Sequence, residues 1–343
     1  MNPQPELLPI PLLEWYSEHK RDLPWRRDPT PYHVWVSEIM LQQTRVQAVL
    51  GYYERFLSVC PTVADLAQLP EDQLMKLWQG LGYYNRARSL QKAAKLILTE
   101  HGGRFPSDYE AIRALPGIGD YTAGAISSIA FGIPAPAVDG NVLRVVARIT
   151  GDDTDITSAA MKHKVADQLR RIIPVKAPGD FTQALMELGA TVCLPNGAPL
   201  CEACPAAAFC VAHRTDRTDQ LPVRKAAKAR RVEQRDVYLC FYDNKVALRR
   251  RPSRGLLAGL WEFPNELTPS QPPLESIPHR KGTGKHIFSH VEWHMTVHTL
   301  RADCDDLPEG WVWADRRELE TVYAIPNAFD CCRPLLEQEL PHF

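Results

Sequence analysis

Four cysteines between residues 193 and 210 constrain this chain more than any other feature of its sequence. Cys193, Cys201, Cys204 and Cys210 follow the spacing C-x7-C-x2-C-x5-C. Four thiolates this close in sequence can surround one soft metal centre, either a zinc ion or a [4Fe–4S] cluster. Zinc sites more often use two CxxC pairs far apart, so this compact knot favours the cluster. A closed set of four ligands leaves no open coordination position, which favours a structural or positioning role over catalysis.

The rest of the composition describes an ordinary globular chain. The nine cysteines are odd in number and four of them lie within residues 193–210, which indicates a metal site rather than a disulfide framework. The formal net charge is −1, so binding to a polyanion would need a local basic surface. The first residues lack the pattern of a secretory signal, and no apolar stretch approaches the roughly 20 residues that span a bilayer. We expect a cytoplasmic protein, bacterial in view of its short N-terminus, with no membrane contact.

The distribution of apolar residues divides the 343 residues into two parts. Residues 6–213 carry apolar residues at three- and four-residue spacing between short Pro/Gly breaks, which indicates helices. From residue 235 on, alternating runs such as 237–242 and 294–300 indicate strands. The basic stretch between these parts has few apolar residues, as exposed linkers do. The predicted organisation is a helical domain at 1–214, a linker at 215–234 and an α+β domain at 235–343.

A glycine-rich turn, LPGIGDYTAG, separates two predicted helices at Leu115–Gly124. Gly117 and Gly119 allow a tight turn and can present backbone amides at the start of the next helix, where they can hold a phosphate. A plain helix–helix turn would use the same residues, so the motif does not decide alone. Further along, Asp139 is a lone carboxylate in the apolar segment AVDGNV, where it could cap a helix, serve chemistry, or do both.

The order of these motifs carries a family resemblance. LPGIGDYTAGAI, then VDGN, then the cysteine knot resembles the helix-hairpin-helix DNA glycosylases of the endonuclease III group, and within it the MutY-type adenine glycosylases. The resemblance covers nearly the whole chain. It implies a mainly α helix-hairpin-helix domain with a [4Fe–4S] cluster in the loop 193–210, plus a smaller α+β Nudix-like domain. It also implies a monomer that acts on double-stranded DNA, flipping out adenine mispaired with 8-oxoguanine or guanine and hydrolysing its N-glycosidic bond.

The resemblance assigns the chemistry to four residues. Glu38 lies in the apolar helical segment VSEIMLQQT, where desolvation would keep it protonated, so that it can protonate adenine at N7. A buried glutamate paired with an arginine is the alternative reading of this position. Tyr121 would help to hold the base by a hydrogen bond, and Asn141 would orient the site. Asp139 would stabilise or capture the oxocarbenium-like sugar.

Two positions in the sequence indicate that the enzyme does not cut the DNA backbone. Bifunctional relatives carry a lysine where this chain has Tyr121, and some adenine glycosylases carry one shortly after the aspartate, where this chain has Leu143 and Arg144. Without an amine nucleophile a Schiff-base mechanism has no starting point, so we predict a monofunctional glycosylase.

Further residues match positions that contact DNA in the family. By resemblance, Arg26 next to Trp25 and also Gln183 line the adenine pocket, while Gln42 and Tyr83 wedge into the duplex and offset the cost of unstacking. Without the resemblance, Tyr83 would be read as an ordinary core aromatic. The predicted substrate- and DNA-binding set is Arg26, Gln42, Thr44, Leu81, Tyr83, Gly117, Gly119, Gln183, Phe288, Ser289 and His290.

The C-terminal part resembles the Nudix-like domain of adenine glycosylases, on the segments 249–251 and 255–264. The acidic metal-binding helix of Nudix hydrolases is not evident after them, and a Pro-rich segment at 268–278 follows, which disfavours nucleotide hydrolysis. By resemblance, Phe288, Ser289 and His290 match a loop that reads 8-oxoguanine. The N7–H of 8-oxoguanine could donate a hydrogen bond to Ser289, whereas N7 of guanine is an acceptor. Five histidines between 279 and 298 also permit a metal site, although scattered polar residues explain them better.

The first cysteine gap is seven residues, one more than this family leads us to expect, and the turn-prone loop 194–200 could absorb the extra residue. Two other functions stay open. One is removal of thymine from G·T mismatches by a related glycosylase, against which the 288–290 loop argues. The other is a mismatch-binding protein without catalysis, against which Glu38 and Asp139 argue.

Overall fold

The computed structural model describes residues 4–226, 229–274 and 280–340, which divide into two compact units. The first unit comprises Met1–Gln68 and Ser89–Ala226, and the second comprises Leu69–Arg88 and Ala227–Phe343. The short segment 69–88 therefore folds with the C-terminal part of the chain. Strand β1 begins at Arg231, inside the predicted linker 215–234.

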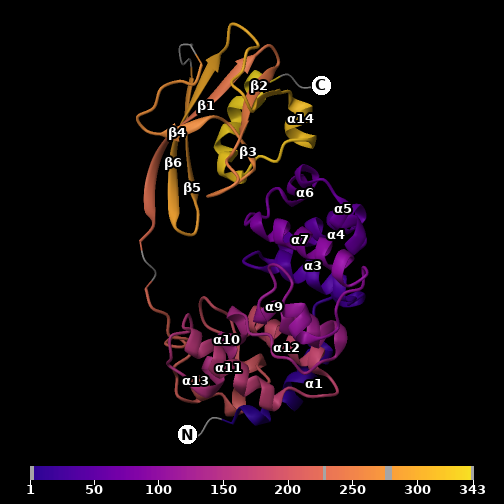
Figure 1. Cartoon of the computed structure of the whole chain (residues 1–343). Helices are drawn as coiled ribbons and strands as arrows, with labels where there is room; N and C mark the ends of the chain where they lie inside the picture. The colour runs from indigo at the N-terminus through magenta and orange to yellow at the C-terminus, as the bar shows by residue number, and fades with distance from the viewer. Residues whose placement is uncertain (1–3, 227–228, 275–279, 341–343) are drawn as a thin grey trace. The chain divides into compact units, whose positions relative to one another are not determined.

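The first unit is helical, as the apolar spacing predicts (Figure 1). Its helices are η1 (Pro5–Leu7), α1 (Pro9–His19), α2 (Pro24–Arg27), α3 (Pro31–Leu41), α4 (Val46–Val59), α5 (Val63–Gln68), α7 (Asn85–Glu100, whose first residues belong to the second unit), α8 (Tyr109–Arg113), α9 (Asp120–Phe131), α10 (Gly140–Thr150), α11 (Ala159–Ile172), α12 (Pro178–Thr191), η2 (Cys201–Ala203), η3 (Ala207–Phe209) and α13 (Val211–Arg214).

Helices α9, α10 and α12 carry much of the site described below. Helix α12 packs against α1, α9 and α10, and α3 packs against α9. Close contact of α10 with α12 depends on Gly189, because a Cβ there would lie 2.5 Å from the Cβ of Asn141. Buried apolar side chains from α1, α10, α11 and α12 form one continuous core with residues of the cysteine loop. The loop that holds the cysteines is thus fixed to the helices by packing.

The second unit is built on one mixed sheet of seven strands. Its main path is β3-β2-β1-β6-β5, with β4 paired to β1 and β7 to β2. Strands β1 and β6 are parallel, with Val237 opposite Val297, and the other pairs are antiparallel. The elements are α6 (Glu71–Trp78), β1 (Arg231–Tyr242), β2 (Lys245–Arg250), β3 (Trp261–Glu262), β4 (Asn265–Leu267), β5 (Arg280–Ile287), β6 (Val291–Arg301), β7 (Trp311–Ala314), α14 (Arg316–Thr321), η4 (Asn327–Cys332) and α15 (Arg333–Glu339).

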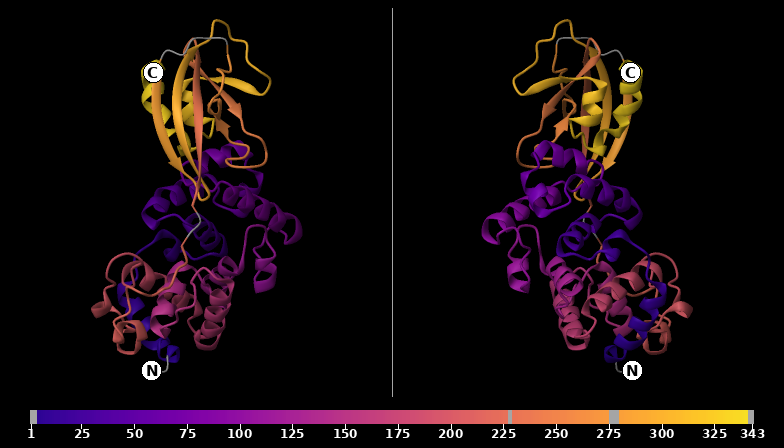
Figure 2. Two further views of the ribbon diagram at one scale, coloured as in Figure 1. Left: turned by 90° about the vertical axis from the view of Figure 1, so that its left-hand side faces the viewer. Right: turned by 90° about the vertical axis from the view of Figure 1, so that its right-hand side faces the viewer.

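Successive side chains of β1 point to opposite faces of this sheet. Val237, Leu239 and Phe241 pack on one face with η4 residues such as Phe329, while Tyr238 and Cys240 pack on the other. Figure 2 shows the C-terminal helices, drawn in yellow, lying against the sheet. The predicted strands at 237–242 and 294–300 lie within β1 and β6. In the part of the chain that the structure describes, no helix has both the length and the apolar character needed to cross a membrane.

Candidate active site and cysteine cluster

Glu38 lies on α3 at the wall of a cavity of about 760 Å³ in the first unit. The helix begins after Thr30, whose side chain accepts a hydrogen bond from the backbone N–H of His33. Nearly all of its later residues are apolar and buried, and Glu38 itself is 5% exposed. Burial raises the pKa of Glu38 to about 7, against the lowering effect of a hydrogen bond from Tyr121. The carboxyl group can therefore hold a proton at neutral pH.

Tyr121 lies in the first turn of α9 and donates its phenolic hydrogen to Oε2 of Glu38. Its hydroxyl also lies 3.9 Å from Sδ of Met186 on α12. Burial, followed by the charge of Glu38, raises the pKa of Tyr121 well above its ordinary value, so the phenol remains a hydrogen-bond donor.

Asp139 lines the same cavity and caps α10 at the same time. Its Oδ1 accepts from the backbone N–H of Val142 at 2.7 Å, and its Oδ2 accepts from Nδ2 of Asn141 at 2.8 Å. Burial raises the pKa of Asp139, while these hydrogen bonds oppose the rise. The structure confirms the predicted helix cap, and the same carboxylate also lines the cavity.

Arg144 connects this carboxylate to the cysteine loop, a link that sequence reasoning missed. Its Nη2 donates to Oδ1 of Asn141 at 2.8 Å and to the carbonyl of Gly189 at 2.7 Å. Its Nε donates to the carbonyl of Cys193 at 2.8 Å. Arg144 is 7% exposed, and burial lowers its pKa. Polar contacts therefore run from Asp139 through Asn141 and Arg144 to the first cysteine.

A second buried polar group forms another part of the cavity wall. Glu187 on α12 accepts from Arg21 at 2.6 and 2.9 Å and from Arg26 at 2.7 Å. Burial acts to raise the pKa of Glu187, but the hydrogen bonds from the two arginines outweigh it and lower the pKa to about 2. Arg26 was predicted to line this cavity, whereas Glu187 and Arg21 were not. A lone glutamate in the apolar segment FTQALMELGA is the signal that could have found Glu187.

The structure brings some predicted residues into this cavity and leaves others elsewhere. Gln42, at the end of α3, is not among the residues that line the cavity and donates to Oγ1 of Thr122 at 3.3 Å. Gly117 and Gly119 form the turn before α9, where Gly117 has a φ of +79° and a Cβ would lie 2.5 Å from Cβ of Ser89. The predicted residues that line the cavity are Arg26, Glu38, Thr44, Tyr121, Asp139, Asn141 and Gln183.

The remaining predicted residues belong to the second unit. Tyr83, Phe288, Ser289 and His290 line a separate cavity of about 640 Å³, in which the Tyr83 hydroxyl lies 3.2 Å from Oγ of Ser289. Tyr83 has a φ of +47° and is 48% exposed, so it is not the core aromatic that composition alone suggests. Leu81 is buried in the turn before it.

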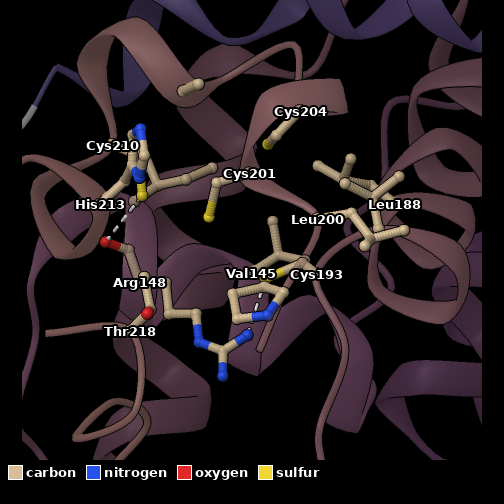
Figure 3. A pocket seen from close by; sticks show the side chains of 14 residues that line it. Val145, Arg148, Leu188, Cys193, Leu200, Cys201, Cys204, Cys210, His213 and Thr218 are labelled. Atoms are coloured by element: carbon tan, nitrogen blue, oxygen red, sulfur yellow. Dashed lines mark hydrogen bonds between the residues drawn. The ribbon is translucent and has the colours of Figure 1, made fainter. Parts of the chain in front are cut away.

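The four cysteines line one small cavity between α10, α12 and the loops that follow (Figure 3). The loop 194–200 is closed by backbone hydrogen bonds from Leu194 and Leu200 to the carbonyl of Val192, at 3.0 and 2.9 Å. Its tip, 195–198, is exposed. The extra residue in the first cysteine gap is thus accommodated in a loop that returns to its starting point.

The four cysteines are a donor set that fits an iron–sulfur cluster, since four thiolates are the ligands such a cluster takes and all four line this cavity. Across residues 4–226, 229–274 and 280–340, no three His, Cys, Asp or Glu side chains are placed to hold one metal ion. His279, one of the five C-terminal histidines, lies outside the described residues.

The second unit contains a buried acidic residue, Glu262, that already binds three neighbouring side chains. Glu262 is 1% exposed and forms ion pairs with Arg249 and Arg251, and it accepts a further hydrogen bond from Asn265. After it, the described residues 265–274 form the short strand β4 and then no regular element.

Comparison with known proteins identifies the class. Residues 36–171 match the HhH-GPD superfamily of base excision DNA repair proteins, and residues 237–333 match the NUDIX domain. The solved structure of a thermostable thymine-DNA glycosylase aligns with a TM-score of 0.55 and 28% identity, over 62% of this chain and 97% of that one. The chain therefore combines a helix-hairpin-helix base excision repair fold with a Nudix-like domain, which confirms the predicted fold class.

Sequence relatives then identify the family. The adenine DNA glycosylase of Rattus norvegicus is 38% identical, over 84% of this chain and 69% of the relative. That of Homo sapiens is 35% identical, over 91% of this chain and 70% of the relative. The adenine DNA glycosylase of Schizosaccharomyces pombe is 32% identical, over 91% of this chain and 85% of the relative. The chain belongs to the adenine DNA glycosylases, DNA N-glycosylases of base excision repair.

Proposed function

We propose that this protein hydrolyses the N-glycosidic bond of adenine mispaired with 8-oxoguanine or guanine, without cutting the DNA backbone. One observation carries the proposal. A buried carboxyl group, Glu38, whose pKa lies near 7, shares a cavity with a second carboxyl group, Asp139. Cleavage of a glycosidic bond needs an acid for the leaving group and an anion for the cationic sugar, and this pair provides both.

Glu38 acts as the general acid in this mechanism. Because Tyr121 donates to Oε2, the carboxyl group can keep its own proton on Oε1 and deliver it to N7 of a flipped-out adenine. Protonation makes the base a better leaving group. Burial supports this role, because desolvation disfavours the ionised carboxylate and so keeps Glu38 protonated before the proton is transferred.

Asp139 faces the sugar side of the reaction. Its two hydrogen bonds, from Asn141 and from the backbone of Val142, fix the carboxylate in one orientation. A fixed carboxylate can stabilise the developing oxocarbenium ion without rearrangement, or capture it in a transient bond that water then hydrolyses. Tyr121 stands where an amine would be needed for backbone cleavage, so the product is an abasic site.

Base selection and DNA contact use residues of both units. In the first unit, Arg26, Thr44 and Gln183 lie on the wall of the cavity that a flipped base would enter. Gln42 follows α3 and would contact the duplex. The turn with Gly117 and Gly119 offers backbone amides at the start of α9 for a phosphate. In the second unit, Tyr83 precedes α7 and would enter the duplex next to the lesion, a role that we also assign to Gln42. Leu81, predicted to contact DNA, is buried in the turn before Tyr83.

Reading of 8-oxoguanine is assigned to the loop of Phe288, Ser289 and His290. Oγ of Ser289 opens on a cavity and lies beside the Tyr83 hydroxyl, so it can accept a hydrogen bond from N7–H of the oxidised base. Guanine has an acceptor at N7 and cannot make this bond.

The cofactor we propose is a [4Fe–4S] cluster held by Cys193, Cys201, Cys204 and Cys210. When bound, it supplies four metal–thiolate bonds that fix the loop and no open position for substrate. The chain's own residues transmit this fixation, since Arg144 joins the Cys193 carbonyl to Asn141 in the active site. We further propose that the protein works as a monomer on the bacterial chromosome.

The test is single-turnover base release from a duplex with one adenine opposite 8-oxoguanine, beside A·G, A·T and G·T duplexes. Strand cleavage at the adenine only after alkali, fastest opposite 8-oxoguanine, is the expected result. Release from G·T alone would assign the protein to thymine removal. Binding without release from any duplex would make it a mismatch-binding protein, and cleavage without alkali would refute the monofunctional mechanism.

A further inference from the structure

Arg148 contacts two of the four cysteines in the loop 193–210. It lies on α10, one helical turn beyond Arg144, and is 5% exposed. Its Nη1 donates to Sγ of Cys193 at 3.3 Å, and its own backbone carbonyl lies 3.4 Å from Sγ of Cys210, as the dashed lines in Figure 3 show. The first and last cysteines of the knot therefore both contact one residue.

The remaining contacts of Arg148 anchor it. Nη1 also donates to the carbonyl of Leu194 at 2.9 Å, and Nε donates to the carbonyl of Leu221 at 2.8 Å. These acceptors hold the plane of the guanidinium against the cysteine loop. A planar guanidinium fixed in this way presents a directed donor to one sulfur, which a flexible lysine would not do.

Within the part of the chain that the structure describes, no carboxylate pairs with the guanidinium of Arg148. Among the described residues, no Asp or Glu oxygen lies within 4.0 Å of its side-chain nitrogens. Its acceptors are carbonyl oxygens and one sulfur. A buried cation without an anion is costly, and a guanidinium does not lose its proton in proteins. Arg144, also buried, points a second guanidinium at Cys193 through the carbonyl of that residue.

We propose that Arg148 is the counter-charge of the iron–sulfur group and that its hydrogen bond to Cys193 sets the reduction potential of that group. This inference rests on the proposed cofactor, because the four thiolates and the cluster would supply the missing negative charge. Hydrogen bonds to the cluster sulfurs are among the features that set the potential of such centres.

The direction of the effect follows from electrostatics. A positive donor at a cysteine sulfur stabilises the form of the cluster that holds one more electron. Removing the donor therefore makes it easier for one electron to leave the cluster, with no bond made or broken. For Arg148→Met we expect the ratio of oxidised to reduced cluster at a fixed electrode potential to rise about tenfold, a downward shift of about 59 mV for one electron.

The experiment uses the full chain, in which the iron–sulfur cluster is reconstituted anaerobically with ferrous iron and sulfide. Iron and sulfide content and adenine release are first measured on the wild type, so that failure of the cofactor or of the proposed function is seen separately. The midpoint potential is then measured for the wild type, Arg148→Met, Arg148→Lys and Arg170→Met. Arg170 is an exposed arginine of the same unit, paired with Asp167, and serves as the control for loss of one positive charge.

A lower potential in Arg148→Met, an intermediate one in Arg148→Lys and no change in Arg170→Met would support the proposal. An unchanged potential in a fully loaded Arg148→Met protein would overturn it. If Arg148→Met does not take up iron, pulsed EPR of the oxidised cluster in protein with ¹⁵N-labelled arginine decides. The wild type should show a coupling to an arginine nitrogen that Arg148→Lys lacks, and absence of any such difference would overturn the proposal.

Discussion

The phenol of Tyr121 donates its hydrogen to Oε2 of Glu38, a buried carboxyl group at the wall of the cavity. Two opposing effects meet at this carboxyl group. Desolvation raises its pKa, and the phenol lowers it by favouring the ionised form. The balance leaves a pKa of about 7, close to the pH at which an acid catalyst is most useful.

Replacement of Glu38 by Gln should abolish base release and leave binding to the lesion duplex intact. Glutamine has nearly the shape of glutamic acid but no proton to transfer, and loss of a general acid costs about 10²- to 10⁴-fold in rate. Single-turnover kinetics and gel-shift affinity on the same duplex check this. A fully active variant would refute the assignment of the acid.

The rate of base release should fall as the pH rises through about 7, because the protonated form of Glu38 is the active one. In Tyr121→Phe the hydrogen bond that favours the ionised carboxylate is absent, so the pKa of Glu38 rises and this alkaline limb moves to higher pH. Single-turnover rates between pH 5 and 9, measured for both proteins, show the shift. An alkaline limb at the same pH in both would contradict the coupling of these two residues.

Arg144→Met should destabilise the first unit and slow base release. The change leaves buried acceptors on Asn141, Gly189 and Cys193 without their donor, and unsatisfied groups of this kind cost about 1–3 kcal/mol each before the structure relaxes. We expect a loss of about 2–4 kcal/mol in the free energy of unfolding, measured in urea. Arg170→Met, an exposed change, should stay within about 0.5 kcal/mol, and equal stability of the two variants would show that the Arg144 contacts are unimportant.

Ser289→Ala should reduce the preference for 8-oxoguanine over guanine opposite adenine. Loss of one hydrogen bond is worth about 0.5–1.5 kcal/mol, which corresponds to roughly a twofold to tenfold change in the ratio of rates. Excision from the A·G duplex is the internal control and should change little. Adding His290→Ala should erode the preference further, and undiminished discrimination in the double variant would exclude this loop as the reader.

Sequence patterns located residues whose surroundings are local in the chain. Glu38 interrupts an apolar helical segment and Asp139 stands alone before a helix, so both could be found without knowing their partners. The ion pair of Glu187 could not be found in this way, because its partner Arg21 is 166 positions away. The same holds for Arg144, whose acceptor Cys193 is 49 positions further on. Association of residues 69–88 with the C-terminal part also depends on distant contacts, and no periodicity predicts it.

Gly189 has no side chain, and the packing of α12 against Asn141 depends on that. Its α-carbon lies where α12 meets Asn141, and its carbonyl receives the Arg144 guanidinium. Any side chain at this position would push against the residue that orients Asp139. In a catalogue of inherited or laboratory variants, a change from glycine to alanine here would be scored as harmless by chemical similarity. The geometry predicts instead that the new methyl group displaces Asn141, although the change replaces none of the residues that line the cavity.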